Sequence, residues 1–153
     1  MRLGARRAGG HASGMSRLLA LAAVLLLALP LTGCPDRSTR QDALDRALYA
    51  YAGMIRWGEF EAAHEYLDPE LRAAAPLTEL DLERYRQIQI TSYRLKSAGP
   101  TPDGGYARTA EVGVVNRHTQ TERTVQALET WRWDEDARRW WLTSGLPPVT
   151  AQR

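Results

Sequence analysis

Three side chains in this sequence have types and settings that could carry chemistry. Cys34 is the single cysteine of the chain and directly follows an apolar run, so its thiol is open to covalent modification. His64 and Glu129 stand among apolar residues farther along. Imidazole exchanges a proton near neutral pH, and a carboxyl group held away from water can act as a general acid or base. The elements around each side chain decide between such roles and structural ones.

The segment before Cys34 has the layout of an export signal. Four arginines precede residue 18, and residues 18–31 form an apolar run without a charged side chain. A charged start followed by such a run is typical of a signal peptide. The run contains Pro30 and is shorter than the roughly 20 apolar residues that a membrane-spanning helix needs. Translation from Met15 instead of Met1 would leave a compact signal peptide, so both starts stay open.

The last four residues of this segment are Leu31, Thr32, Gly33 and Cys34. They resemble the lipobox of bacterial lipoproteins, which is an aliphatic residue, two small residues and an obligatory cysteine. The resemblance implies that residues 1–33 are removed and that diacylglyceryl is attached to the thiol of Cys34. Two or three acyl chains, at about 0.8 kcal/mol per buried methylene, would make a stable anchor. A buried structural thiol is the alternative, but polar residues follow this cysteine.

The residue after the lipidated cysteine bears on the choice of membrane. In the lipoprotein family an Asp at that place is the usual signal for retention in the inner membrane of a Gram-negative cell. This chain has Pro35 there and Asp36 one place later. The resemblance therefore favours the outer membrane over the inner one, with the protein facing the periplasm.

Removal of the signal changes the charge and narrows the possible partners. All 18 acids lie after residue 33 but only 16 of the 20 Lys and Arg do, so the mature chain carries a formal charge of −2. We therefore expect no nucleic-acid partner. His64 and His118, without a free thiol, are too few for a typical zinc site, and we expect neither metal nor cofactor. The remaining chain, about 120 residues, is long enough to be stable through its core alone.

Helical patterns fill the first half of the mature chain. Ser38 and Gln41 match a capping box, which predicts a short lipidated tether over 34–41 before the first helix. A second helix beginning at Glu59 would carry His64 on its apolar stripe. The predicted helical segments are 39–57, a short helix from Glu59, a brief turn from Pro69 capped by Asp68, and a helix opened by Thr78 and Asp81.

Patterns with a period of two follow from residue 87. Ile88 and Ile90 occupy one parity whereas Tyr93 and Leu95 occupy the other, which predicts a bulge or bend near Thr91. The further predicted strands are 106–114, 125–133 and 139–146. Together the elements predict an α+β domain over 42–148 with a tail over 149–153, in which N-terminal helices pack on a bent antiparallel sheet of about four strands.

Two stretches, 57–71 (WGEFEAAHEYLDPEL) and 140–148 (WWLTSGLPP), bear a likeness to a known superfamily. They resemble the first helix joint and the terminal strand of the nuclear transport factor 2-like, or cystatin-like, cone domains. The resemblance implies helices packed on the concave face of the sheet. Because enzymes, binding modules and scaffolds share this fold, it implies no single activity.

His64 and Glu129 are the candidates to line a pocket inside such a cone. His64 could serve as a general base, or it could be a satisfied core residue. Glu129 is the single acid on an apolar strand face, where it could do acid/base work or pair, near the sheet edge, with Arg123 or with a neighbouring strand's arginine. The enzymatic hypothesis is an isomerase, cyclase or hydrolase-like activity on a hydrophobic small molecule, and no catalytic residue is assigned.

Trp140 and Trp141 are the candidates for an exposed aromatic interface. Adjacent residues of a strand point to opposite faces, so one of the two should be exposed or covered by a partner. The partner could be a second copy of the chain or another envelope protein, whereas neighbouring Arg and Thr side chains could shield the ring within a monomer. We therefore expect a membrane-anchored envelope lipoprotein with a non-catalytic binding or scaffolding module, and a small lipid-anchored enzyme is the alternative.

Overall fold

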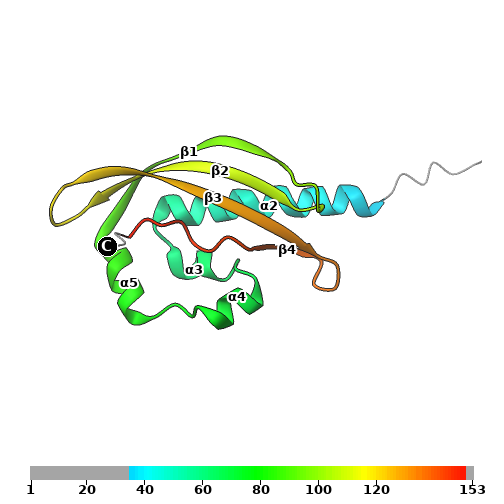
Figure 1. Cartoon of the computed structure of the whole chain (residues 1–153), viewed down its shortest axis with the longest axis horizontal. Coiled ribbons are helices and arrows are strands. Elements are labelled where there is room, and N and C mark those ends of the chain that lie inside the picture. Colours follow the sequence, from blue (N-terminus) through cyan, green and yellow to red (C-terminus); the bar gives the residue numbers. More distant parts are fainter. Residues whose placement is uncertain (1–34, 151–153) are drawn as a thin grey trace, which may run out of the picture. The chain divides into compact units, whose positions relative to one another are not determined.

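The computed structural model describes residues 35–150, in which helices come first and an antiparallel sheet follows (Figure 1). The helices are α2 (Pro35–Trp57), α3 (Phe60–His64), α4 (Pro69–Ala74) and α5 (Glu79–Arg86), and the strands are β1 (Ile88–Pro100), β2 (Tyr106–Asn116), β3 (Glu122–Asp134) and β4 (Arg139–Leu142). The predicted α+β class, with helices on a four-stranded antiparallel sheet, is confirmed. The predicted signal peptide, Cys34 and the end of the predicted tail lie outside the described residues.

The sheet has the order β1-β2-β3-β4, and each strand is antiparallel to its neighbour. The pairing of β1 with β2 is irregular between Ile90 and Ser92, where the change of parity predicts a bulge, and again between Leu95 and Ser97. β1 therefore forms one edge of the sheet with two interruptions in its register. The other edge, β4, is covered by backbone hydrogen bonds from Asp68 N to the Leu142 carbonyl and from Leu142 N to the Tyr66 carbonyl.

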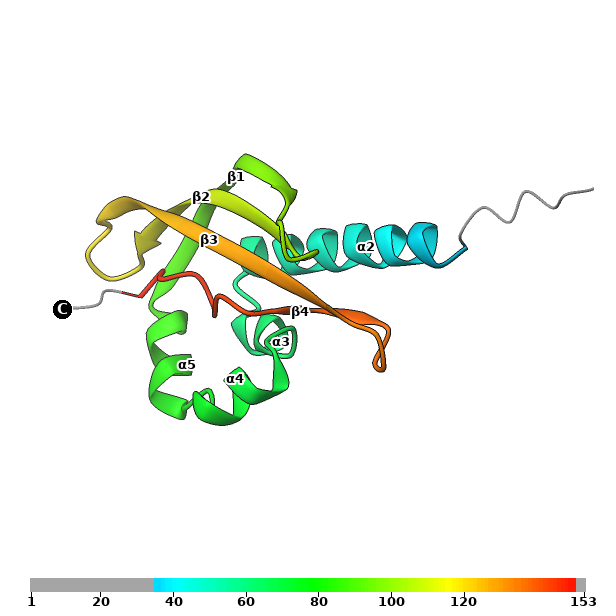
Figure 2. The same cartoon turned by 45° about the vertical axis from the view of Figure 1, so that its right-hand side comes forward.

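The core lies between α2 and one face of the sheet. Figure 2 shows the strands running across α2, with α3, α4 and α5 gathered near β4 and the start of β1. Every second residue of β2 and β3 faces this core, as Val112 and Trp131 do with 0% and 2% exposure. The ring of Tyr51 on α2 meets Trp131 edge to face at 5.3 Å between centroids. Phe60 and Tyr85 stack at 4.0 Å and join α3 to α5.

Local capping explains where two helices begin. The Asp68 side chain accepts a hydrogen bond from Glu70 N at 3.0 Å and caps α4, as predicted. Thr78 and Asp81, the residues predicted to open a helix, do so at the start of α5 and form a capping box there. Both predictions are confirmed.

The start of α2 differs from the sequence expectation. The helix begins at Pro35 and not near Thr39, so most of the predicted tether over 34–41 is helical and Ser38 lies inside the helix. Proline is well suited to a first helical position because its fixed φ is helical and its missing N–H would lack a partner there. No helix within residues 35–150 is long and apolar enough to cross a membrane.

Candidate functional site

Glu129 lies at the centre of a buried polar cluster in the core. The register of β2 and β3 places it directly opposite Arg108, and it is only 1% exposed. Arg108 Nε donates a hydrogen bond to Glu129 Oε2 at 2.5 Å, and the Tyr93 hydroxyl donates one to Oε1, also at 2.5 Å. Arg108 Nη2 donates to the Leu48 carbonyl of α2 at 3.3 Å. One carboxylate thus links three strands and the long helix.

Two tyrosines complete the surroundings of this carboxylate. Burial, and then the charge of Glu129, raise the pKa of Tyr93 well above the usual value. The same two causes, in the same order, raise the pKa of Tyr51. Both phenols therefore stay protonated at neutral pH, and Tyr93 remains a hydrogen-bond donor to Glu129. The hydroxyl of Tyr51 is fully buried and has no hydrogen-bond partner among the described residues.

His64 is buried at a separate place. It lies on α3 with 8% exposure, and its Nε2 is 3.3 Å from the carbonyl oxygen of Ala75. The imidazole lines a hollow of about 250 Å³ together with Leu71, Leu146 and others, and Glu129 is not among the lining residues. Both pocket candidates are thus inside, as expected from their phase. The structure does not bring them into one site.

The expected exposed aromatic surface at Trp140 and Trp141 is wrong, because both rings are buried, with 5% and 7% exposure. Trp140 faces the core and its Nε1 donates to the Arg40 carbonyl at 3.0 Å. Trp141 points to the other face, where the Arg139 guanidinium lies over the ring at 3.8 Å. Its Nε1 donates to Asp134 Oδ2 at 3.1 Å. The alternative expectation, that neighbouring side chains shield the rings within the monomer, agrees with the structure.

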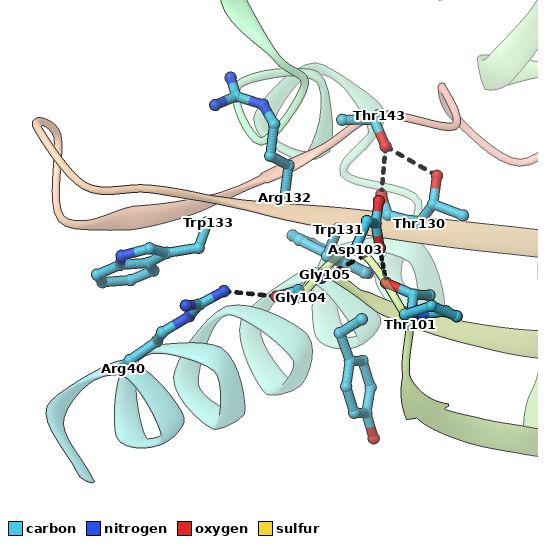
Figure 3. A pocket seen from close by; sticks show the side chains of 12 residues that line it. Arg40, Thr101, Asp103, Gly104, Gly105, Thr130, Trp131, Arg132, Trp133 and Thr143 are labelled. Atoms are coloured by element: carbon cyan, nitrogen blue, oxygen red, sulfur yellow. Dashed lines mark hydrogen bonds between the residues drawn. The ribbon is translucent and has the colours of Figure 1, made fainter. Parts of the chain in front are cut away.

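A hollow of about 610 Å³ lies where the turn between β1 and β2 approaches α2 and β3 (Figure 3). Arg40 reaches across from α2 and donates a hydrogen bond to the Gly104 carbonyl at 2.5 Å. Its guanidinium lies 5.6 Å from the centre of the Trp133 ring. Gly105 is required in this turn, because a Cβ there would lie 2.7 Å from the Trp131 carbonyl oxygen.

The charged groups at this hollow already have partners. Arg132 Nη2 lies 2.5 Å from Asp68 Oδ2, and the hydrogen bond from Arg132 lowers the pKa of Asp68. Thr101 bonds Asp103 within the turn, and Arg40 also lies 4.0 Å from Glu135. A ligand would have to replace these contacts. We therefore interpret the residues around the hollow as contacts that hold α2 against the sheet.

Arg108 and Tyr93 are the cluster members that sequence analysis did not single out. Arg108 alternates with the same period as Ala110 and Val112, so the sequence places it on the apolar face of its strand. An arginine on that face is a natural partner for an inward acid. The partner of Glu129 is indeed a neighbouring strand's arginine, but it lies inside the core and not at the sheet edge. Arg123, the other suggested partner, donates to the Val149 carbonyl instead.

Neither a search for metal-binding groups nor a comparison with known proteins assigns a function to any of these residues. Within the described part of the chain, no three His, Cys, Asp or Glu side chains are grouped so that they could hold a metal ion. No protein-family model matches this chain, and no curated protein or solved structure matches it. The likenesses to lipoproteins and to the cone superfamily therefore depend on the residues quoted for them.

Proposed function

We propose that this protein is a membrane-anchored lipoprotein of the bacterial cell envelope, whose domain is a non-catalytic binding or scaffolding module. The observation that carries the proposal is the apolar run that ends in Leu31, Thr32, Gly33 and Cys34. Lipid on Cys34 would hold the domain on the periplasmic side of its membrane. Pro35 in the place of a retention-signal Asp favours the outer membrane.

The closed cluster around Glu129 supports a non-catalytic role. A general base must lie within hydrogen-bond reach of the proton it takes. Each oxygen of Glu129 accepts a hydrogen bond, one from Arg108 and one from Tyr93, and the residue is only 1% exposed, which favours a structural role. His64 has its own carbonyl partner elsewhere. The cone-like interior is therefore assigned to holding helix and sheet together.

The partner surface of the module lies away from Trp140 and Trp141, since both rings are covered within the chain. In this proposal the partners are the membrane, through Cys34, and a second copy or another envelope protein. Crosslinking and copurification of the native lipidated protein would identify the protein partner. Recovery of the monomer alone in membranes, over a range of crosslinkers, would contradict a scaffolding role.

Mass spectrometry of the protein from its native membrane tests the anchor. The mature chain should begin at Cys34 and carry diacylglyceryl on the thiol, with or without a third acyl chain on the amino group. Cys34→Ser should leave an uncleaved or soluble precursor, and Thr32→Ala, which keeps a small residue before the cysteine, is the matched control that should still be processed. Absence of any acyl mass on the wild type would contradict the proposal.

Membrane fractionation on a density gradient tests the placement independently. The wild type should sediment with outer-membrane markers, and Pro35→Asp should move the protein toward the inner membrane. Recovery of the wild type with inner-membrane markers would overturn the placement and leave the anchor intact.

A further inference from the structure

The outward side of α2 carries two large aromatic side chains that are mostly exposed. Tyr49 is 82% exposed and Trp57 is 83% exposed, whereas Tyr51 and Ile55 on the inward side are fully buried. At 100° and 1.5 Å per residue, Tyr49 and Trp57 are about 80° apart around the helix axis and about 12 Å apart along it. They therefore lie on one side of the helix, and we call them the outer aromatic pair.

The outer aromatic pair is accompanied by exposed arginines. Arg46 lies one turn before Tyr49 and is exposed. Arg56, next to Trp57, is also exposed, but its guanidinium lies 5.3 Å from the centre of the Tyr93 ring of β1. Tyr and Trp concentrate where a bilayer meets water, because each has an apolar body and one polar group. An arginine beside them, as Arg46 is, can bury its methylenes and keep its guanidinium among the headgroups. A lipid headgroup layer is thus the surface whose chemistry fits this side of α2.

The position of Cys34 supplies the reason to choose a bilayer over a protein. Cys34 directly precedes Pro35, the first residue of α2. The Cα atoms of neighbouring residues are about 3.8 Å apart, so a lipid on Cys34 would be attached right at the start of the helix. The 23 residues of α2 span about 34 Å. A helix held at its first residue either rises from the bilayer, which leaves the outer aromatic pair in water, or lies along it.

We infer that α2 lies along its membrane with Tyr49 and Trp57 in the headgroup layer. This inference rests on the proposed lipid anchor and adds an orientation to it. The sheet packs on the opposite side of the helix, where Trp131 meets Tyr51. The other face of the sheet, which carries Leu128 with 61% exposure, then faces away from the membrane.

Tryptophan fluorescence can test this orientation without a foreign probe. Among the described residues Trp57 is the one exposed tryptophan, since Trp131, Trp133, Trp140 and Trp141 are all at most 8% exposed. The difference between the spectra of the wild type and Trp57→Phe therefore isolates Trp57. The full lipidated protein is placed in phosphatidylethanolamine and phosphatidylglycerol vesicles, with and without acyl chains brominated near the headgroup.

The matched control moves the reporter to the far face of the sheet. Glu129 points to the core, so its neighbour Leu128 points outward from the sheet. In Trp57→Phe/Leu128→Trp the new indole should be quenched by acrylamide and not by brominated lipid. Trp57 should show the reverse, with emission at shorter wavelength, several-fold stronger quenching by brominated lipid and several-fold weaker quenching by acrylamide.

The outcomes separate this inference from the proposed function. Acyl mass on Cys34 is measured on the same sample, and its absence would overturn the anchor and the orientation together. With the acyl mass present, acrylamide quenching of Trp57 equal to that of the control reporter would overturn the orientation alone. Protection of Trp57 from both quenchers would assign this side of α2 to a second copy or another protein, which also overturns it.

Discussion

Arginine joins α2 to the sheet at two places, and the two joints differ in their contact with water. In the Glu129 cluster, Arg108 is buried, bonds a carboxylate on the next strand and reaches the Leu48 carbonyl of α2. At the hollow of Figure 3, Arg40 is about one-third exposed and reaches the Gly104 carbonyl from α2. The same residue type thus makes two kinds of contact between α2 and the sheet. Arg108 depends on charge pairing in the core, whereas Arg40 remains partly solvated. Their removal should have very different costs.

The largest expected effect is at Glu129. Glu129→Gln keeps the shape of the side chain but leaves Arg108 buried without a counter-charge, which should lower the free energy of unfolding by about 3–5 kcal/mol. Urea unfolding followed by circular dichroism measures it. The matched control is Arg108→Met/Glu129→Leu, which removes both charges and should recover most of the loss. An unchanged unfolding midpoint in Glu129→Gln would mean that the cluster does not stabilise the core.

Tyr93→Phe should have the next largest effect, because it removes only one hydrogen bond to the carboxylate. A hydrogen bond to a charged group contributes about 1.5–3 kcal/mol. The raised pKa of Tyr93 also gives a pH dependence with a definite sign. Above pH about 10 the unfolded chain releases a proton that the folded chain keeps, so stability falls as the pH rises.

The alkaline fall in stability provides the control for Tyr93. Unfolding free energies measured between pH 9 and about 11 should fall less steeply in Tyr93→Phe than in the wild type, with the slope from Tyr51 retained. Equal slopes in the two proteins would contradict the assignment of Tyr93 as a buried protonated donor.

Asp68 should show an intermediate effect, since it caps α4 and also pairs with Arg132. Asp68→Ala should cost about 0.5–2 kcal/mol at neutral pH, whereas Asp68→Asn keeps a capping side chain and should cost less. The lowered pKa of Asp68 means that its charge stabilises the fold above pH about 4, and that this stabilisation disappears as the pH falls through the folded-state pKa. Wild type and Asp68→Asn should converge at low pH, and a constant gap would contradict the ion pair.

Arg40 should show the smallest effect. Arg40→Gln removes a partly exposed cation from the Trp133 and Trp140 rings, and such contacts contribute about 0.5–1 kcal/mol at exposed sites. Thermal unfolding should therefore shift by only a few degrees, and far less than for Glu129→Gln. A loss as large as that of Glu129→Gln would remove the distinction between the two joints.

Features that depend on neighbouring residues could be predicted from the sequence. The caps at Asp68 and Thr78 are hydrogen bonds over two or three residues, and the change of parity around Thr91 records the bulge directly. The inward side of Glu129 follows from the alternation of its strand. The start of α2 could not be decided in this way, because Pro35 and Ser38 are both residue types that favour a helix start.

Features that depend on the meeting of distant elements were out of reach. Trp141 is covered because the side chain of Arg139 folds over its ring. The spacing of residues in the sequence does not determine that side-chain conformation. His64 and Glu129 lie apart because of where α3 packs relative to β3. The position of each residue in its helical or strand repeat shows only that its side chain points inward. Arg108 was not singled out, although its parity places it on the inward face of its strand, where an arginine can pair with an inward acid.

The irregular edge strand β1 has a consequence if the protein is confined to a membrane surface, as proposed. Molecules anchored in a plane meet one another far more often, and with fewer orientations, than molecules free in solution. An unbroken outer edge would then invite strand-by-strand polymerisation into ribbons. The register breaks at Ile90/Ser92 and Leu95/Ser97 divide that edge into short pieces, and Lys96 places a charge on it. On the proposed anchor, we expect these interruptions to hinder edge-to-edge growth of fibres between neighbouring molecules.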